Sequence, residues 1–283
     1  MKRAAIVVAI LSTCVWSFGQ DKAASQSTPA APAQAAPAGK RPPQAKTQPE
    51  FDAYKAAVGL TDPAEAEKAA ADFATKFPDS ELRVVLYKSA MQKYQQANNA
   101  DKMMEMAQKA LTYDPDDPES LLGVAQVLAE RTRDTDLDKD QRLAEAKKDA
   151  ERALNTVNTD LPTAGIAPEQ LAQYKAFMQS EAYAILGSLA SGAKNWPDAE
   201  TDLKKSIDMF PQQVDPVAVL RLAVALDMQN KFPEALKYAN QAVDLTKDRA
   251  DSPAGKAARA EQDRLTKLNS GTAPGQTAAP AKN

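Results

Sequence analysis

The acidic stretch "DTDLDKDQRLAE", residues 134–145, carries the densest group of side chains that could do chemistry. Carboxylates occupy alternate positions at its start and return at its twelfth residue: Asp134, Asp136, Asp138, Asp140 and Glu145. Carboxylate oxygens that converge within a short loop are the ligands that hard cations such as Ca²⁺ prefer. A calcium site is therefore one hypothesis for this stretch.

The calcium loop of EF-hand proteins, to which the stretch is similar, requires residues that are missing here. Lys139 stands where that loop needs glycine for a sharp turn, and Gln141 replaces an apolar residue. The alternative is a charged insertion between two helices, in which Asp138 or Asp140 helps to begin the helix "QRLAEAKKDAERAL". We favour this alternative and expect neither a metal ion nor a cofactor.

Other catalytic groups are scarce. The sequence has no histidine, which removes the most frequent general base and metal ligand. Its one cysteine, Cys14, lies near the N-terminus, and its glycines form no phosphate-binding loop. These absences exclude Ser–His and Cys–His catalysis, so we predict that the protein is not an enzyme. A net charge of −3 gives no reason to expect nucleic-acid binding.

Both ends of the chain differ in composition from its middle. "MKRAAIVVAILSTCVWSFGQ" combines a basic start with a short apolar run, which is typical of a secretory signal peptide. We predict a signal peptide over residues 1–19, followed by an Ala/Pro-rich disordered linker over 20–46. Residues 270–283 are predicted to form a disordered tail. The leader indicates export to the periplasm or cell envelope of a bacterium.

A second interpretation of the leader begins with "LSTC", residues 11–14. This stretch resembles a bacterial lipoprotein signal, in which Cys14 would become the lipidated first residue and tether the protein to a membrane. Thr13 fits that signal poorly. Ordinary export is the interpretation that we prefer.

The middle of the chain repeats one helical pattern. Helices centred on a small or apolar residue recur, each with two more such residues four and seven places later. Spacings of four and seven place all three on one helix face. The five centres are Ala66, Met103, Ala146, Ala199 and Ala235. A second helix with its own apolar face precedes each of them. One such pair cannot bury its own apolar face, so neighbouring pairs must stack.

This pattern resembles the tetratricopeptide repeat family. The best match is residues 180–213, where the signature spacings are filled by Leu186, Gly187, Trp196, Ala199, Leu203, Ser206 and Pro211. The resemblance implies an all-α fold, a right-handed superhelical solenoid of about five helical hairpins. They would cover residues 47–249 as 47–80, 84–117, 118–159, 180–213 and 216–249, with a capping helix over 250–269.

In this family the first helix of each hairpin lines a concave surface. The matching positions include amides, single charges and aliphatic side chains, which suit an extended peptide or a partner helix. They are Val85, Lys88, Gln92, Glu119, Leu122, Gln126, Glu181, Ala184, Ser188, Val217, Leu220 and Val224. The resemblance thus implies a non-enzymatic scaffold with an unidentified protein partner, and the leader indicates that it acts in the cell envelope. The alternative is a lipoprotein that assists outer-membrane protein assembly or transport, because "KFPDSELR" is similar to a stretch of such proteins.

Overall fold

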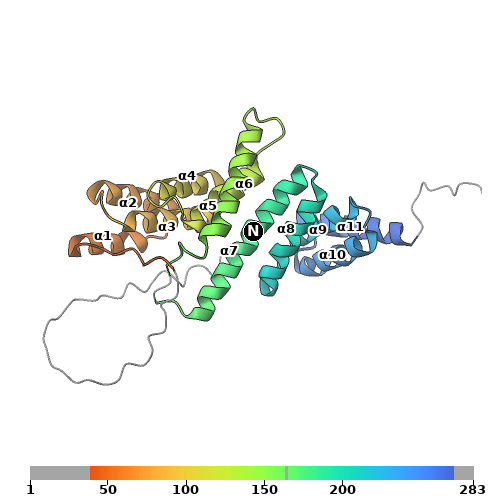
Figure 1. The fold of residues 1–283 in the computed structure, drawn as a ribbon. Helices are drawn as coiled ribbons and strands as arrows, with labels where there is room; N and C mark the ends of the chain where they lie inside the picture. Colours follow the sequence, from red (N-terminus) through yellow and green to blue (C-terminus); the bar gives the residue numbers. More distant parts are fainter. Residues whose placement is uncertain (1–38, 163–164, 271–283) are drawn as a thin grey trace, which may run out of the picture. The chain divides into compact units, whose positions relative to one another are not determined.

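The computed structural model describes residues 39–162 and 165–270. Within these residues the chain forms eleven α-helices and no strand (Figure 1). The predicted signal peptide with Cys14, most of the predicted linker and the predicted tail beyond residue 270 lie outside the described residues. The helices are α1 (Gln48–Val58), α2 (Pro63–Lys76), α3 (Leu82–Gln96), α4 (Ala100–Leu111), α5 (Pro118–Arg131), α6 (Lys139–Thr156), α7 (Pro168–Gly192), α8 (Trp196–Met209), α9 (Pro216–Asp227), α10 (Phe232–Leu245) and α11 (Pro253–Asn269). The predicted all-α class is confirmed.

The helices belong to two compact units. Among the described residues, unit 1 contains those from 39 to Val127 together with those of Arg152–Lys175, and unit 2 contains Leu128–Glu151 together with the chain from Ala176 to residue 270. The helices α1 to α4 thus lie wholly in unit 1, and α8 to α11 lie wholly in unit 2.

Most helices begin at a residue whose side chain satisfies the free backbone amides of the first turn. Asp62 accepts hydrogen bonds from the amides of Ala64 and Glu65, and Ser252 accepts one from Gly255. Proline follows both caps, at a position where a missing N–H costs nothing. The starts of α2 and α11 therefore have a local cause, which is capping.

The core of unit 1 is built from the small and apolar residues of the repeated pattern. On α2, Ala66, Ala70 and Phe73 are buried, and α2 packs against α3. On α4, Met106 and Ala107 have no exposed surface, and α4 also packs against α3. The predicted helix faces are therefore the buried ones. Alanine at these positions allows the helices to approach closely.

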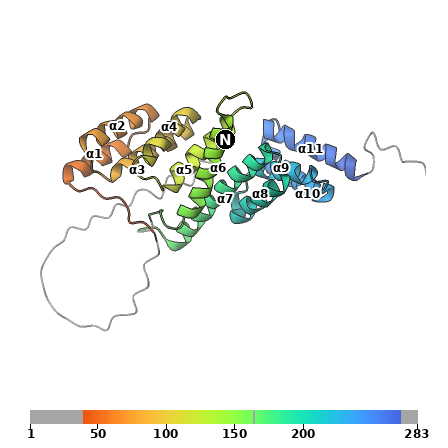
Figure 2. The ribbon, with the colours of Figure 1, turned by 45° about the horizontal axis from the view of Figure 1, so that its top comes forward.

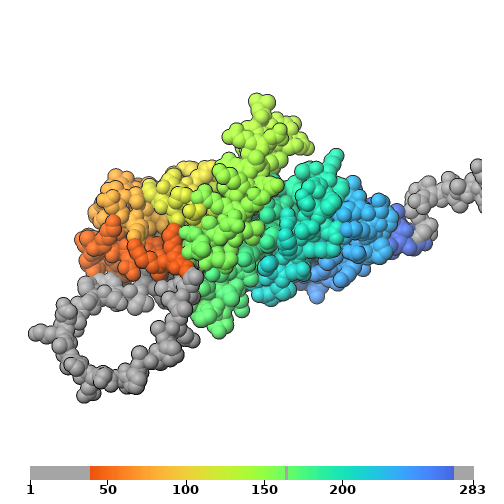
Figure 3. Space-filling view, viewed as in Figure 1, coloured from red at the N-terminus to blue at the C-terminus, as the bar shows by residue number. Residues whose placement is uncertain are grey.

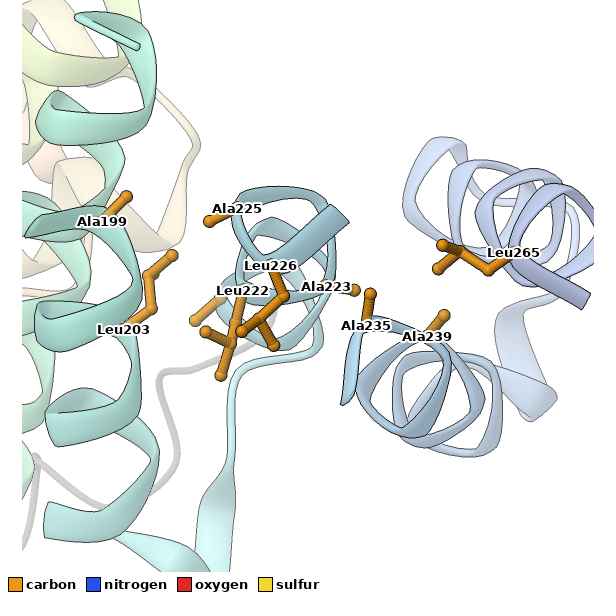
Figure 4. Packing of buried hydrophobic residues seen from close by; sticks show 10 residues of the cluster. Ala199, Leu203, Leu222, Ala223, Ala225, Leu226, Ala235, Ala239 and Leu265 are labelled. Atoms are coloured by element: carbon orange, nitrogen blue, oxygen red, sulfur yellow. The ribbon is translucent and has the colours of Figure 1, made fainter. Parts of the chain in front are cut away.

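Unit 2 repeats this arrangement with its own core. Figure 4 shows α9 between α8 on one side and α10 and α11 on the other. Leu222 and Leu226 of α9 are fully buried, as is Leu265 of α11. The terminal helix α11 therefore supplies a side chain to the core, while most of its other residues remain accessible to water. This arrangement closes the apolar face of the preceding hairpin.

One glycine in unit 2 is required by a close approach between helices. A Cβ atom placed on Gly187 of α7 would lie 2.6 Å from Cγ and 3.1 Å from the backbone nitrogen of Leu203 on α8. Such distances are shorter than van der Waals contact. The glycine at the signature position of the best-matching hairpin therefore allows its two helices to touch. The helix α7 itself begins at Pro168, ahead of the predicted hairpin start at residue 180.

Residues 40–46, which we call the strap, lie against unit 1 in an extended conformation. They were predicted to be part of the linker. Figure 2 shows this stretch running from the start of α1 to the chain that follows α6. There Lys40 pairs with Pro162 in an isolated parallel β-bridge, and its backbone N–H donates to the carbonyl of Leu161 at 3.2 Å. The strap thus joins parts of unit 1 that are far apart in the sequence.

Candidate protein-binding surface

The residues predicted to contact a partner all lie on the first helices of hairpins. In unit 1 they are Val85, Lys88 and Gln92 on α3 and Glu119, Leu122 and Gln126 on α5; in unit 2 they are Glu181, Ala184 and Ser188 on α7 and Val217, Leu220 and Val224 on α9. Lys88 and Leu122 are buried, and the other ten are half-buried. We call these two sets the first-helix faces of unit 1 and unit 2.

The charged members of the unit 1 face form a buried cluster. Nζ of Lys88 donates to Oδ2 of Asp117 at 2.7 Å and lies 3.1 Å from Oε2 of Glu119. The second contact lacks the geometry of a hydrogen bond, so attraction between the two charges holds it. The Lys88 side chain is only 9% exposed. The structure therefore pairs Lys88 and Glu119 with each other, inside the chain.

The pKa values of this cluster show how strongly its charges interact. Burial alone lowers the pKa of Lys88, but the charges of Asp117 and Glu119 outweigh burial and raise that pKa above its usual value. Burial raises the pKa of Glu119, and the positive charge of Lys88 offsets only part of this effect. Lys88 therefore stays a cation, because its loss of hydration is compensated by two carboxylates.

Asp117 was not among the predicted site residues. Its Oδ1 accepts hydrogen bonds from the backbone N–H of Ser120 at 2.9 Å and from the Ser120 hydroxyl at 2.7 Å, so it caps α5. The same carboxylate receives the ammonium group of Lys88 through its other oxygen. An aspartate directly before a proline and a helical stretch is a recognisable cap in the sequence. Its contact with α3 could be found only in the folded chain.

Apart from the buried Leu122, the remaining positions of the unit 1 face are half-buried. Val85 and Gln92 lie on α3, and Gln126 lies on α5. A half-buried amide presents donors and acceptors beside apolar surface, which is the combination that a bound peptide backbone requires. The cluster around Lys88 holds the two helices that carry these side chains. It acts as a support rather than as a contact for a ligand.

The unit 2 face is less charged. Ala184 and Ser188 are half-buried on α7, and Val224 is half-buried on α9. Leu220 packs against a buried group that includes Val219 and Ala242. The hydroxyl of Ser180 donates to the backbone carbonyl of Ser206 at 2.7 Å and fixes α7 to α8. Aliphatic side chains and one hydroxyl thus remain partly accessible on helices that are firmly packed.

Glutamates on the second helices join successive hairpins. In unit 1, Glu67 of α2 accepts hydrogen bonds from the hydroxyl of Tyr94 at 2.6 Å and from Lys102 at 2.9 Å. In unit 2, Glu200 of α8 accepts from Gln229 at 2.8 Å and from Lys231 at 2.7 Å. Both follow directly after the small residue on which their repeat is centred. The same repeat position therefore holds the next hairpin in both units.

The pKa of Glu200 is lowered to about 2. Burial alone raises it, but hydrogen bonds from Lys204, Lys231 and Gln229 outweigh burial. The pKa of Glu67 is lowered for the same reason, with Tyr94 and Lys102 as the donors. These links between hairpins thus depend on ionised carboxylates.

The acidic stretch that suggested calcium begins in the loop between α5 and α6 and continues into α6, which contains Asp140 and Glu145. Asp134 accepts a hydrogen bond from Lys139 at 2.7 Å, and Asp136 accepts one from the backbone N–H of Arg133 at 2.8 Å. Among the described residues no three His, Cys, Asp or Glu side chains are grouped so that they could hold a metal ion. In the space-filling view this loop projects from the surface at the N-terminal end of α6 (Figure 3). At its tip, Leu137 is fully exposed.

Among the helices that the structure describes, none combines the length and the apolar character required to cross a membrane.

Comparisons with known proteins give matches among solved structures alone. No protein-family model and no curated protein sequence matches the chain. Among solved structures, the assembly chaperone of RpL4 (Acl4) matches with 12% identity and a TM-score of 0.40, over 78% of this chain and 98% of that one. PilW, a type IV pilus biogenesis factor, matches with 16% identity and a TM-score of 0.39, over 75% and 99%. At TM-scores this low, neither match assigns a function to this chain.

Proposed function

We propose that the protein is a non-enzymatic scaffold of the tetratricopeptide type, which binds an extended peptide or a helix of a partner protein on its first-helix faces. The observation that carries the proposal is that the first helices are not completely covered. They supply many buried residues to the core, and beside these they keep half-buried amide and aliphatic side chains. A partner could cover that remaining surface without disturbing the core.

Binding to such a surface requires no conformational change of the protein. The side chain of Gln92 can donate to and accept from a peptide backbone, while Val85, Leu220 and Val224 offer apolar area. The helices that carry them are fixed by the Lys88 cluster in unit 1 and by the contact between Ser180 and Ser206 in unit 2. A rigid surface loses little conformational entropy when a partner binds, and this favours affinity.

We place this activity in the bacterial cell envelope, because the sequence begins with a stretch typical of a signal peptide. The proposal does not require lipid on Cys14. An exported scaffold of this kind would act on other envelope proteins through binding alone, without turnover of a substrate.

Site-specific photo-crosslinking of the full chain in its native cells tests the proposal. A photoreactive residue at Gln92 or Ser188 is compared with one at Lys68 or Lys237, which are exposed on the second helices α2 and α10. We expect one protein to be crosslinked at least tenfold more from the first-helix positions. The variants Gln92→Arg and Ser188→Arg, with unchanged helical circular dichroism, should reduce binding of that purified protein at least tenfold. Equal crosslinking from all four positions would contradict the proposal.

A further inference from the structure

The strap lies along one edge of unit 1. The chain segments that follow α2, α4 and α6 form this edge. Nζ of Lys40 donates to both carboxylate oxygens of Asp114 at 2.6 Å, and it lies 3.7 Å from Asp160. Asp114 belongs to the connection between α4 and α5, and Asp160 follows α6. One side chain of the strap therefore joins the ends of two successive hairpins.

The next contacts along the strap reach the connection between α2 and α3. Arg41 forms an ion pair with Glu81, and the other oxygen of Glu81 accepts a hydrogen bond from the backbone N–H of Gln44 at 3.4 Å. The guanidinium group of Arg41 is the main reason why the pKa of Glu81 is lowered. Nζ of Lys46 donates to the carbonyl of Asp79 at 2.7 Å. All three basic residues of the strap thus contact loops between helices.

A buried carboxylate fixes the end of the strap nearest to α1. Glu50 is only 3% exposed, and its Oε2 accepts a hydrogen bond from the backbone N–H of Lys46 at 2.7 Å. Its Oε1 accepts a hydrogen bond from the hydroxyl of Ser80. The Oγ atom of Ser80 in turn accepts a hydrogen bond from the backbone N–H of Leu82 at 3.1 Å. The edge therefore includes a buried polar group that recognises the strap backbone, in addition to its surface charges.

Between its charged contacts the strap presents apolar residues to unit 1. Pro42, Pro43 and Ala45 are half-buried, whereas Arg41 and Gln44 are exposed. Two adjacent prolines favour an extended chain and carry no N–H that would lose a partner. The edge thus contacts a Lys-Arg pair, two prolines and a further lysine within one extended segment.

The contacts also indicate that the strap can leave the edge. The side chain of Lys40 is 40% exposed, that of Arg41 is 63% exposed, and no helix includes either residue. Exposed ion pairs are weak and are screened by salt. Without the strap, Glu81, Asp114 and Asp160 would lose the cations that they contact. We propose that this acidic edge is a binding site for an extended basic, proline-containing segment of another protein, and that the chain's own strap occupies the site and competes with that segment.

Competition within one chain has a predictable consequence. The strap is attached to α1 and so has a high effective concentration at the edge, which weakens the apparent affinity for a separate peptide. A chain with a weakened strap should therefore bind such a peptide better than the parent does. The edge is distinct from the first-helix faces, so this proposal can fail while the proposed function holds.

Fluorescence anisotropy with the full chain tests this proposal. The probe is a labelled synthetic peptide with the sequence of residues 39–47, GKRPPQAKT. The double variant Lys40→Ser/Arg41→Ser should bind the peptide at least tenfold more tightly than the parent chain. Raising the salt concentration from 50 to 300 mM should weaken this binding at least fivefold. Adding Asp114→Asn and Glu81→Gln to the double variant should abolish it.

Controls separate recognition from charge attraction and from loss of structure. The variant Lys55→Ser/Lys68→Ser removes two exposed lysines that do not contact the edge, and it should bind no better than the parent. A scrambled peptide of the same composition should bind at least tenfold more weakly than the probe. If the double variant loses helical circular dichroism, the single variant Lys40→Ser replaces it. No gain in binding by a helical strap variant, or equal binding of the scrambled peptide, would overturn the proposal.

Discussion

Lys88 shows most clearly what a single residue does in this protein. A lysine on a first helix is expected to offer its charge to a partner. In the folded chain that charge is neutralised by Asp117 and Glu119, and the three side chains join α3 to the beginning of α5. Its role is therefore to position the helices that carry Gln92 and Gln126.

The variant Lys88→Met should destabilise the protein by about 3–5 kcal/mol at pH 8, because it leaves two buried carboxylates without a cation. The loss should be smaller at pH 5, since the pKa of Glu119 is already raised and protonation would remove one of the buried charges. Urea denaturation of the full chain at both pH values measures this. Lys68→Met, at a side chain that is 77% exposed, should change the free energy of unfolding by less than about 0.5 kcal/mol. Equal effects of the two variants would show that the cluster is not stabilising.

At the scale of elements, hairpins are joined by contacts from one second helix to the next hairpin. Apolar burial on α8, α9 and α10 provides most of the attraction between these helices. The hydrogen bonds of Glu200 help to orient the next hairpin relative to α8, because they reach the turn between α9 and α10. Stacking of hairpins in unit 2 is therefore sensitive to the protonation of one carboxylate.

The pH dependence of that contact follows from its pKa. A carboxyl group with an ordinary pKa of 4.5 in the unfolded chain and about 2 in the folded one stabilises the fold above about pH 5. This stabilisation is lost as the pH falls from about 5 to about 2. Glu200→Gln should therefore be less stable than the parent by about 1–3 kcal/mol at pH 7, and the difference should shrink through that window. Thermal denaturation as a function of pH measures it.

Glu169→Gln serves as the control for this measurement, because Glu169 is exposed in the first turn of α7. It should follow the pH profile of the parent. A constant difference between Glu200→Gln and the parent from pH 7 to pH 2.5 would contradict the assignment.

At the scale of the whole molecule, each of the two units contains its own core. The helices α5, α6 and α7 each contribute residues to both units. In an array of stacked hairpins each element contacts mainly its neighbours, so the last hairpin needs a cover for its apolar face. In unit 2 that cover is α11, whose Leu265 lies fully buried in the core shared by α8, α9 and α10.

Leu265→Ala should lower the free energy of unfolding of unit 2 by about 2–5 kcal/mol, because it creates a cavity in that core. Hydrogen exchange followed by mass spectrometry of the full chain should show faster exchange in α9, α10 and α11, with α2 to α4 unchanged. Leu268→Ala, at a half-buried position on the same helix, should have a smaller effect. Unchanged exchange in α9 and α10 would show that α11 is not part of the array.

Local patterns in the sequence predicted the all-α class and the buried side of several helices, although they did not predict that α7 begins at Pro168. The spacing of Ala66, Ala70 and Phe73 predicts one buried face, and the structure buries all three. Caps such as Asp62 and Ser252 act within three residues, so the helix starts can be inferred without a fold. The position of the acidic insertion between two helices follows from the same periodicity.

Contacts between residues far apart in the sequence were decided only by the tertiary structure. Lys88 and Asp117 are 29 positions apart, and nothing in either local pattern indicates that their charges meet. Lys40 and Asp114 are 74 positions apart, and the strap that joins them has the composition of a linker. Periodicity determines which face of a helix avoids water, but the partner of a charge depends on how the hairpins stack.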